Sequence, residues 1–230
     1  MSKPKVVAFV YDFPHQKSVL GLLELALNGY DDVLCIAAPK RDLNLPHSPT
    51  RIAPIHEQQH PWRVARRLGF EYEICPHKHC QHLAQMGDVG IILGARVLPP
   101  NVTGLMPIVN LHPGLLPQNR GLDNVKWAIT KALPQVVTAH VIDEEIDRGF
   151  YLSHKLIDVF PDDTLMDVHL RLFYAQFGMI APNLELALKA PGVRLAEGAY
   201  HRPMTPDEDA QMLLNFPDYK RHYRRIVEGV

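Results

Sequence analysis

The chain has 230 residues, 47% of them hydrophobic, and carries 24 basic and 25 acidic side chains. This length can bury the core of one large domain. The formal net charge of -1 gives no electrostatic basis for binding nucleic acid or an acidic membrane. The apolar run 89–95 is far shorter than the ~20 residues of a membrane-spanning helix, and the N-terminus lacks the apolar core of a signal peptide. Three cysteines leave one unpaired in any disulfide scheme, which favours a reduced, cytoplasmic protein.

Strands and helices alternate through the first half of the sequence. Apolar, β-branched runs predict strands at 6–10, 33–38, 70–75, 89–93 and 108–111, and helical spacing of apolar residues predicts helices at 19–27, 62–68 and 80–86. The polar, Pro-rich stretch 39–61 is expected to be mostly loop. This alternation predicts an α/β fold with a doubly wound, mostly parallel, Rossmann-like sheet covered by helices on both faces.

The second half continues with a helix at 124–133 and strands at 136–142 and 151–159. A long helix is expected after Asp162-Asp163-Thr164, which can cap it, running to about residue 190 with a kink at Pro182. The remainder should hold a strand at 198–202 and a helix after Pro206. We therefore expect a catalytic domain over 1–190 with a short C-terminal extension over 191–230.

Polar side chains with chemical potential stand where one apolar strand ends, in Asn110-Leu111-His112-Pro113-Gly114. Ligands of open α/β sheets bind at the carboxyl ends of the strands. Residues two apart on a strand point to the same side, so Asn110 could donate to a developing oxyanion while His112 moves a proton. Taken alone, an Asn or a His at a strand end equally well anchors a loop.

The residues that follow extend this motif. Residues 115–121 read Leu-Leu-Pro-Gln-Asn-Arg-Gly, and a strand bearing His140 leads to Asp147, which stands 35 residues after His112. The pattern resembles the formyltransferase family, whose members show Asn-x-His-Pro/Ala-x-Leu-Leu-Pro and later a His-bearing strand ending in Asp-x-Gly. That family includes glycinamide ribonucleotide transformylase, methionyl-tRNA formyltransferase, the sugar N-formyltransferases and formyltetrahydrofolate hydrolase.

The resemblance implies transfer of a formyl group from 10-formyltetrahydrofolate to an amine, with three catalytic residues. Asn110 would donate a hydrogen bond to the charged oxygen of the tetrahedral intermediate, an interaction whose loss typically costs ~10²–10³ in rate. His112 would accept or relay the amine proton. Asp147 would orient His112, balance its charge, and hold a water that ferries the proton.

Folate-binding residues are implied by the same resemblance. The segment 94–98 is similar to the one that lines the family's pterin pocket, and the loop 141–147 would form another wall. The implied residues are Arg96, Val97, Leu98, His140, Asp143 and Glu144. Arg96 can also be read as a surface charge, His140 as a hydrogen-bonded core histidine, and the two carboxylates as simply facing water.

Two clusters of metal-binding residue types are interpreted as coincidental. Residues 56–60 spell His-Glu-Gln-Gln-His, the pattern of zinc proteases, but Pro54 and Pro61 stand too close for a comfortable helix. The stretch 75–82 lacks paired Cys-x-x-Cys knuckles and is expected to be a free, buried thiol followed by a polar loop. No metal is expected, and the resemblance implies none.

The amine acceptor is inferred by elimination within the family. The purine enzyme has a Gly-Ser-Asn-type phosphate loop, whereas this chain reads Tyr11-Asp12-Phe13-Pro14-His15 at that place. Methionyl-tRNA formyltransferase carries a C-terminal barrel and a basic RNA surface, and the hydrolase adds an N-terminal regulatory domain. This chain has a 40-residue tail and no positive net charge. A nucleotide-linked amino sugar is therefore favoured.

Substrate contacts are expected from Tyr11, Arg120, Lys126 and Tyr200, whereas Trp127 is expected in the core. The C-terminal extension would serve dimer or substrate contacts, as in the sugar enzymes. Partners are then small molecules, without nucleic acid or membrane, and a homodimer is compatible with the resemblance. The alternatives are transfer to glycinamide ribonucleotide or another small amine, hydrolysis of the donor to formate, and folate binding without catalysis.

Overall fold

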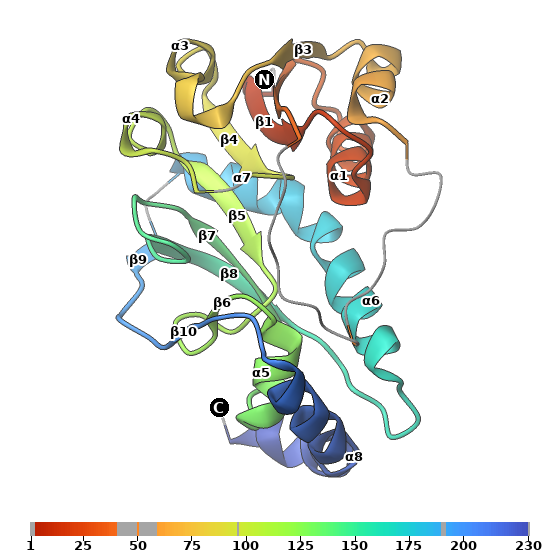
Figure 1. Ribbon diagram of the computed structural model, residues 1–230. Helices are drawn as coiled ribbons and strands as arrows, with labels where there is room; N and C mark the ends of the chain where they lie inside the picture. Colours follow the sequence, from red (N-terminus) through yellow and green to blue (C-terminus); the bar gives the residue numbers. More distant parts are fainter. Residues whose placement is uncertain (1–2, 41–49, 51–58, 96, 190–191, 230) are drawn as a thin grey trace.

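The computed structural model describes residues 3–40, 50, 59–95, 97–189 and 192–229 of the chain. Within these ranges an eight-stranded sheet has the order β3-β2-β1-β4-β5-β7-β8-β9 (Figure 1). Its strands are β1 (Val6–Tyr11), β2 (Val33–Ala38), β3 (Glu71–Ile74), β4 (Val89–Ile92), β5 (Ile108–His112), β7 (Val136–Val141), β8 (Phe150–Leu156) and β9 (Val193–Arg194). The strands from β3 to β5 pair in parallel, and β7, β8 and β9 pair antiparallel to their neighbours. The predicted doubly wound, mostly parallel sheet is confirmed.

The central strand β1 is buried on both faces, because its side chains alternate between two apolar clusters. Val6, Ala8 and Val10 face the larger cluster, and Val7 and Phe9 face the smaller one. The larger cluster is covered by α1 (Gln16–Leu27), α2 (Pro61–Leu68), α6 (Leu165–Ala175) and α7 (Ile180–Lys189), and the smaller by α3 (Gln81–Ala84) and α4 (Pro100–Thr103).

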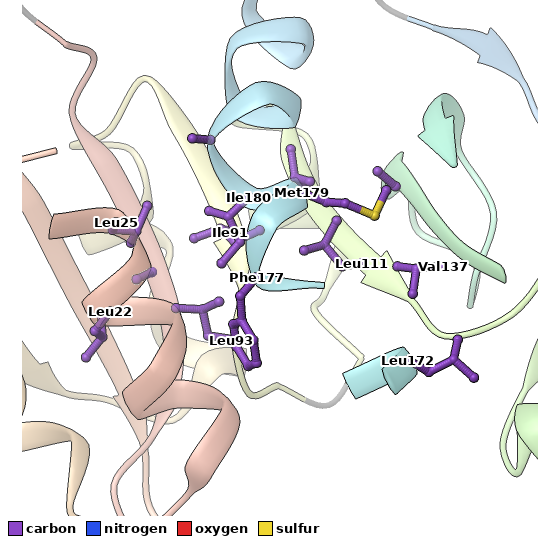
Figure 2. Packing of buried hydrophobic residues seen from close by; sticks show 14 of the residues in the cluster. Leu22, Leu25, Ile91, Leu93, Leu111, Val137, Leu172, Phe177, Met179 and Ile180 are labelled. Carbon is purple, nitrogen blue, oxygen red and sulfur yellow. The ribbon is translucent and has the colours of Figure 1, made fainter. Parts of the chain in front are cut away.

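Figure 2 shows how α1 and the segment before α7 meet over the larger cluster. Leu22 and Leu25 of α1 belong to this cluster together with Leu93, which follows β4, and with Phe177 and Ile180. Each fully buried side chain of this size contributes ~1.5–3 kcal/mol of transfer free energy. This packing fixes the carboxyl ends of β1, β4 and β5 at one edge of the sheet.

The long helix expected after Thr164 is interrupted earlier than the sequence suggested. Thr164 and Asp167 form a reciprocal capping box at the start of α6, but α6 ends at Ala175 and a short 3-10 turn, η2 (Phe177–Met179), precedes α7. Pro182 therefore lies in the first turn of α7, where its missing N–H is not required. The expected kink at Pro182 was wrong for this reason.

The C-terminal segment returns along the molecule to a second, two-stranded sheet. There β10 (Tyr200–His201) pairs in parallel with β6 (Arg120–Gly121), and α8 (Pro206–Glu228) then lies against α5 (Asn124–Thr130) (Figure 1). Four side chains of α8 belong to the larger apolar cluster: Met212, Phe216, Tyr219 and Tyr223. The predicted boundary at 190–191 itself lies outside the described residues. No helix in the described ranges is long and apolar enough to span a membrane.

Candidate active site

The structure brings His112 and Asp147 into contact. His112 ends β5, Asp147 lies in the connection between β7 and β8, and His112 Nδ1 is 3.2 Å from Asp147 Oδ1. The other carboxylate oxygen accepts a 2.8 Å hydrogen bond from the Gly121 backbone N–H. Asp147 has a φ of 50°, in the left-handed region that Asp tolerates better than most residues. Both carboxylate oxygens are thus committed, which fixes the acid against the imidazole.

Asp147 is ionised in this setting. Burial opposes its ionisation, but the contacts with His112 and the Gly121 N–H outweigh burial and hold the pKa of Asp147 below its ordinary value. A negative charge therefore sits beside the Nδ1 edge of His112. The carboxylate can orient the ring and stabilise its protonated form.

The other ring nitrogen of His112 has both an acceptor and a donor within reach. His112 Nε2 lies 2.8 Å from the Asn119 carbonyl oxygen and 3.1 Å from Asn124 Nδ2. A protonated Nε2 can donate to the carbonyl, and an unprotonated Nε2 can accept from the Asn124 amide. His112 is only 4% exposed, so this choice of partners keeps either protonation state satisfied away from water. That is the property required of a group that takes up and returns a proton.

Asn110 is oriented by His140, which stands opposite it on β7. His140 is fully buried, and its Nδ1 lies 2.8 Å from the Arg148 carbonyl oxygen. Because that oxygen only accepts, Nδ1 carries the proton and Nε2 accepts from Asn110 Nδ2 at 3.1 Å. Burial and then the charge of His112 lower the pKa of His140 to about 4, so the ring is neutral. Among the described residues no other hydrogen bond engages the Asn110 side chain, which leaves its second N–H for a ligand.

Of the residues expected to bind folate that the structure describes, Asp143 and Glu144 line a cavity. This cavity has a volume of about 630 Å³ and is also bordered by residues 103–107. Leu98 is buried in the smaller apolar cluster and Val97 is 63% exposed. His140 supports Asn110 from below and has no opening to solvent, which corrects its expected role. Arg96 lies outside the described residues.

A second cavity, of about 760 Å³, lies beyond the carboxyl end of β1. It is lined by Asp12, Pro14, Gln59, His60, Trp62, Arg63 and Ile74. The Trp62 ring is 43% exposed, and Arg63 adds a guanidinium to the lining. The expected substrate residue Tyr11 is half-buried beside this cavity's Asp12 and stacks on Phe13 with ring centroids 4.8 Å apart. An aromatic face and a cation in one hollow suit a flat, anionic ligand.

Two residues expected to contact substrate are engaged within the protein instead. The Arg120 guanidinium donates to the carbonyl oxygens of Ile146 and Gly198. Lys126 is buried, with its ammonium 2.9 Å from carboxylate oxygens of both Asp123 and Asp209. Lys126 is not open to a phosphate, which corrects that expectation, whereas Arg120 is half-buried and holds two carbonyl oxygens. The fourth, Tyr200, is 53% exposed on β10.

The metal-like patterns have other roles where the structure describes them. His60 is the N-cap of α2, its Nδ1 accepting from the Trp62 N–H, so it precedes the helix; His56 and Glu57 lie outside the described residues. Cys75 is half-buried, not buried as expected, because β3 is an edge strand. Within the described ranges no group of three His, Cys, Asp or Glu side chains is placed to hold a metal ion.

Residues that support His112 and Asp147 were not identified from the sequence. Asn119 and Gly121 lie inside the motif, but their spacing does not reveal that the Asn119 carbonyl contacts His112 and the Gly121 N–H contacts Asp147. From the sequence, Asn124 was expected only to begin a helix. His201 was considered only as a possible contact for a diphosphate or a base, and its hydrogen bond with Asn119 was missed because it spans 82 residues.

Comparison with known proteins agrees with this geometry. The family model described as formyl transferase matches residues 57–178, just over half of the chain. The chain belongs to the formyl transferase family, as the motif around His112 had indicated. The matched range contains Asn110, His112 and Asp147.

Individual relatives differ in the acceptors that their names state. A methionyl-tRNA formyltransferase of Heliobacterium modesticaldum is 25% identical over 207 residues, covering 85% of this chain and 63% of the relative. This chain spans 47% and 63% of the lengths of the first two curated relatives it matches. A sugar N-formyltransferase from Shewanella sp FDAARGOS_354 superposes with a TM-score of 0.61 at 20% identity, covering 92% and 87% of the two chains. A glycinamide ribonucleotide transformylase from Symbiobacterium toebii gives 0.61 at 16%, covering 84% and 94%. At these identities the structures show the shared fold alone.

Proposed function

We propose that this protein transfers the formyl group of 10-formyltetrahydrofolate to the primary amine of a nucleotide-linked amino sugar. The observation that carries the proposal is the arrangement of Asn110, His112 and Asp147. One residue keeps a spare amide N–H, and beside it lies a buried imidazole paired with an ionised carboxylate. Formyl transfer needs a donor for a developing oxyanion and a group that moves a proton, and the trio supplies both.

The catalytic residues act on the formyl oxygen and on the proton that the amine loses. As the amine nitrogen bonds to the formyl carbon, the former carbonyl oxygen gains negative charge, and the free N–H of Asn110 donates to it. His112 takes the proton that the amine loses, directly or through a water held by Asp147, and Asp147 balances the resulting positive charge. When the folate nitrogen leaves, the same route returns the proton to it, so His112 ends the cycle as it began.

The cavity bordered by Asp143 and Glu144 is our candidate for the folate donor. Its volume of about 630 Å³ falls in the range of small-molecule sites. The Asp143 oxygens already accept from the Glu145 N–H and from Arg194, so we assign their remaining lone pairs, with the Glu144 carboxylate, to the amino and N–H groups along the edge of a pterin. Leu105 and Met106 add apolar surface for the ring. The donor supplies the activated formyl carbon; the protein supplies the orientation.

The acceptor is assigned to the cavity beyond β1. Trp62 can stack on a nucleotide base, and Arg63 can pair with a diphosphate. Asp12 accepts a 3.0 Å hydrogen bond from Tyr72 and places a negative charge directly after β1. Asp12 lines the same cavity as Arg63, so we assign the diphosphate to the Arg63 side, away from the end of β1. A phosphate at the end of β1, as in the purine enzyme, is disfavoured by the charge of Asp12.

A charged tRNA is the second candidate acceptor, because the curated relatives found by sequence are methionyl-tRNA formyltransferases. The formal net charge of -1 disfavours a large polyanion as partner. We therefore place the small acceptor first.

The test is release of tetrahydrofolate from 10-formyltetrahydrofolate, with product mass measured for one added formyl group. Acceptors are a panel of nucleotide-linked amino sugars, glycinamide ribonucleotide and methionyl-tRNA, with Asp147→Asn as the matched inactive control. Formylation of one nucleotide-linked sugar supports the proposal. Formylation only of tRNA or of glycinamide ribonucleotide overturns the acceptor, and release without any amine overturns transfer in favour of hydrolysis.

A further inference from the structure

The C-terminal segment is built into the support of the candidate active site. In the β6–β10 pair, Tyr200 stands opposite Arg120 and His201 opposite Gly121, whose N–H holds Asp147. The Leu122 N–H donates to the His201 carbonyl oxygen at 2.9 Å. Gly121 has a φ of 95°, and a Cβ there would lie 2.1 Å from that same oxygen. The two segments therefore approach as closely as only glycine permits (Figure 1).

The His201 side chain continues this contact toward His112. His201 is 6% exposed, and its Nδ1 lies 3.1 Å from Asn119 Oδ1. The amide orientation of Asn119 is fixed, because its Nδ2 donates to the Asn124 carbonyl oxygen at 2.8 Å. Oδ1 can only accept, so His201 Nδ1 carries the proton and donates. On its flat side the ring stacks on Trp127, with centroids 4.9 Å apart and planes 17° from parallel.

The space that the His201 ring occupies could also be filled by an apolar ring. His201 Nε2 is buried and has no hydrogen-bond partner, so the ring leaves one polar atom unsatisfied where an apolar ring would leave none. Burial, and then the charge of Lys131, lower the pKa of His201, which keeps the ring neutral. The feature that His201 adds over an apolar ring is the single N–H directed at Asn119.

The His201 Nδ1–H donates to Asn119, the residue whose carbonyl contacts His112. The backbone carbonyl of Asn119 lies 2.8 Å from His112 Nε2 and is the acceptor available to the protonated imidazole. Asn119 is 1% exposed, and its side chain is held only by Asn124 and His201 among the hydrogen bonds of the described residues. Without His201, the Asn119 side chain keeps one partner, Asn124, which itself also contacts His112. The Asn119 backbone keeps its hydrogen bonds with the Leu115 carbonyl and the Asn124 amide.

Resting on the proposed formyl transfer, we propose that His201 is a positioning residue of the active site. It holds Asn119 so that the Asn119 carbonyl meets His112 Nε2 when that nitrogen carries the transferred proton. The C-terminal extension thereby contributes to the chemical step, through Asn119, and not to folding alone. His201 touches neither substrate, so its effect should be on kcat and not on KM.

Two substitutions separate the N–H from the ring. His201→Phe retains a ring to stack on Trp127 but has no donor, whereas His201→Asn places an amide N–H near the position of Nδ1 and loses the stacking. We expect His201→Phe to lower kcat about tenfold, equivalent to ~1.4 kcal/mol, with both KM values within about twofold of wild type. His201→Asn should retain kcat within about threefold although it is the less stable variant in thermal melts.

Amide hydrogen exchange of residues 119–122 gives a readout that does not need activity. Exchange there should be faster in His201→Phe than in His201→Asn. If kcat follows thermal stability, with His201→Asn the slower enzyme, His201 is merely structural and the proposal is overturned. Equal kcat in both variants overturns it as well. Wild-type protein without formyl transfer would overturn the proposed function, and the exchange comparison would still decide whether His201 holds Asn119.

Discussion

Replacing Asp147 by asparagine changes the charge beside His112 while keeping the size of the side chain. The new amide oxygen can still accept from the Gly121 N–H, as Asp147 Oδ2 does at 2.8 Å. Its NH₂ group then faces His112 Nδ1 in place of the oxygen now at 3.2 Å. Because an amide NH₂ only donates, Nδ1 must become the acceptor, and the proton moves to Nε2, where the Asn119 carbonyl receives it. His112 then has no free basic nitrogen.

The size of the loss follows from comparable geometry. In a serine-protease triad the Asp→Asn change, which fixes the wrong tautomer, costs about 10⁴-fold in kcat. His112 is also held by Asn119 and Asn124, so its ring should stay in place, and we expect a loss of about 10²–10⁴-fold in kcat. The free energy of unfolding should change by less than about 2 kcal/mol, because losing a charge-assisted hydrogen bond is partly offset by removing a buried charge.

The pH dependence of stability gives a second measurement of the same substitution. The pKa of Asp147 lies below its ordinary value of 3.8 in the folded protein. The carboxylate therefore stabilises the fold above that pH, and the contribution is lost as pH falls below it. Wild type and Asp147→Asn should consequently converge in stability in acid.

The assay combines steady-state kinetics with the best acceptor and urea unfolding of both proteins. A variant that folds normally and keeps kcat within about threefold of wild type would show that the charge of Asp147 plays no part in the reaction. A variant that loses activity only because it unfolds would leave the kinetics uninterpretable. Asp147→Glu, which keeps the charge but shifts its position, then provides the comparison. If Asp147→Asn and Asp147→Glu both fold and both lack activity, the charge of Asp147 alone does not account for its role.

Three further substitutions test other contacts of the site. Asn110→Ala should lower kcat by about 10²–10³ at unchanged thermal stability, measured by initial rates and melts, because the donor to the developing oxyanion is lost; a loss confined to KM would contradict this. His140→Gln can keep both hydrogen bonds while removing a group whose pKa is about 4 when folded and 6.5 ordinarily. As pH falls from 6.5 to 4, the unfolded chain binds this proton before the folded protein does. The free energy of unfolding of the wild-type protein, measured with urea, should therefore fall by up to about 3 kcal/mol more than that of the variant. Stability curves that run parallel would refute a buried neutral His140. Lys126→Met leaves two carboxylates without their cation, and should cost about 3–5 kcal/mol of stability with KM for the acceptor unchanged; a raised KM in folded protein would restore Lys126 as a substrate residue.

The strand and helix order could be predicted because each element has its own local pattern. Apolar runs such as 33–38 coincide with β2, and the helical spacing in 19–27 falls within α1. The short elements escaped prediction: β6 and β9 have two residues each, and their strand conformation depends on distant partners in the C-terminal segment and β8. Tertiary pairing, not local propensity, makes these strands.

In the candidate site, too, the residues on one strand or in one motif could be predicted, and the contacts between distant segments could not. Asn110 and His112 share one strand, and Asp147 was reached through a motif with fixed spacing, so all three could be named in advance. Lys126 was misjudged because the sequence shows a cation but not the carboxylates that already engage it. The hydrogen bond between His201 and Asn119 could not be predicted, because it joins residues 82 positions apart and leaves no local pattern in the sequence.

The position of α8 has a consequence for how the protein is made. Met212, Phe216, Tyr219 and Tyr223 complete the same apolar cluster that lies beneath α1, a helix nearly two hundred residues earlier in the chain. Tyr223 also ties the edges of β7 and β8, accepting from the Gln135 N–H and donating to the Ile157 carbonyl. The apolar surface of a nascent chain therefore stays partly uncovered until residues 212–223 have left the ribosome. Uncovered apolar surface favours aggregation over that interval, and closure of the core is a late event in synthesis.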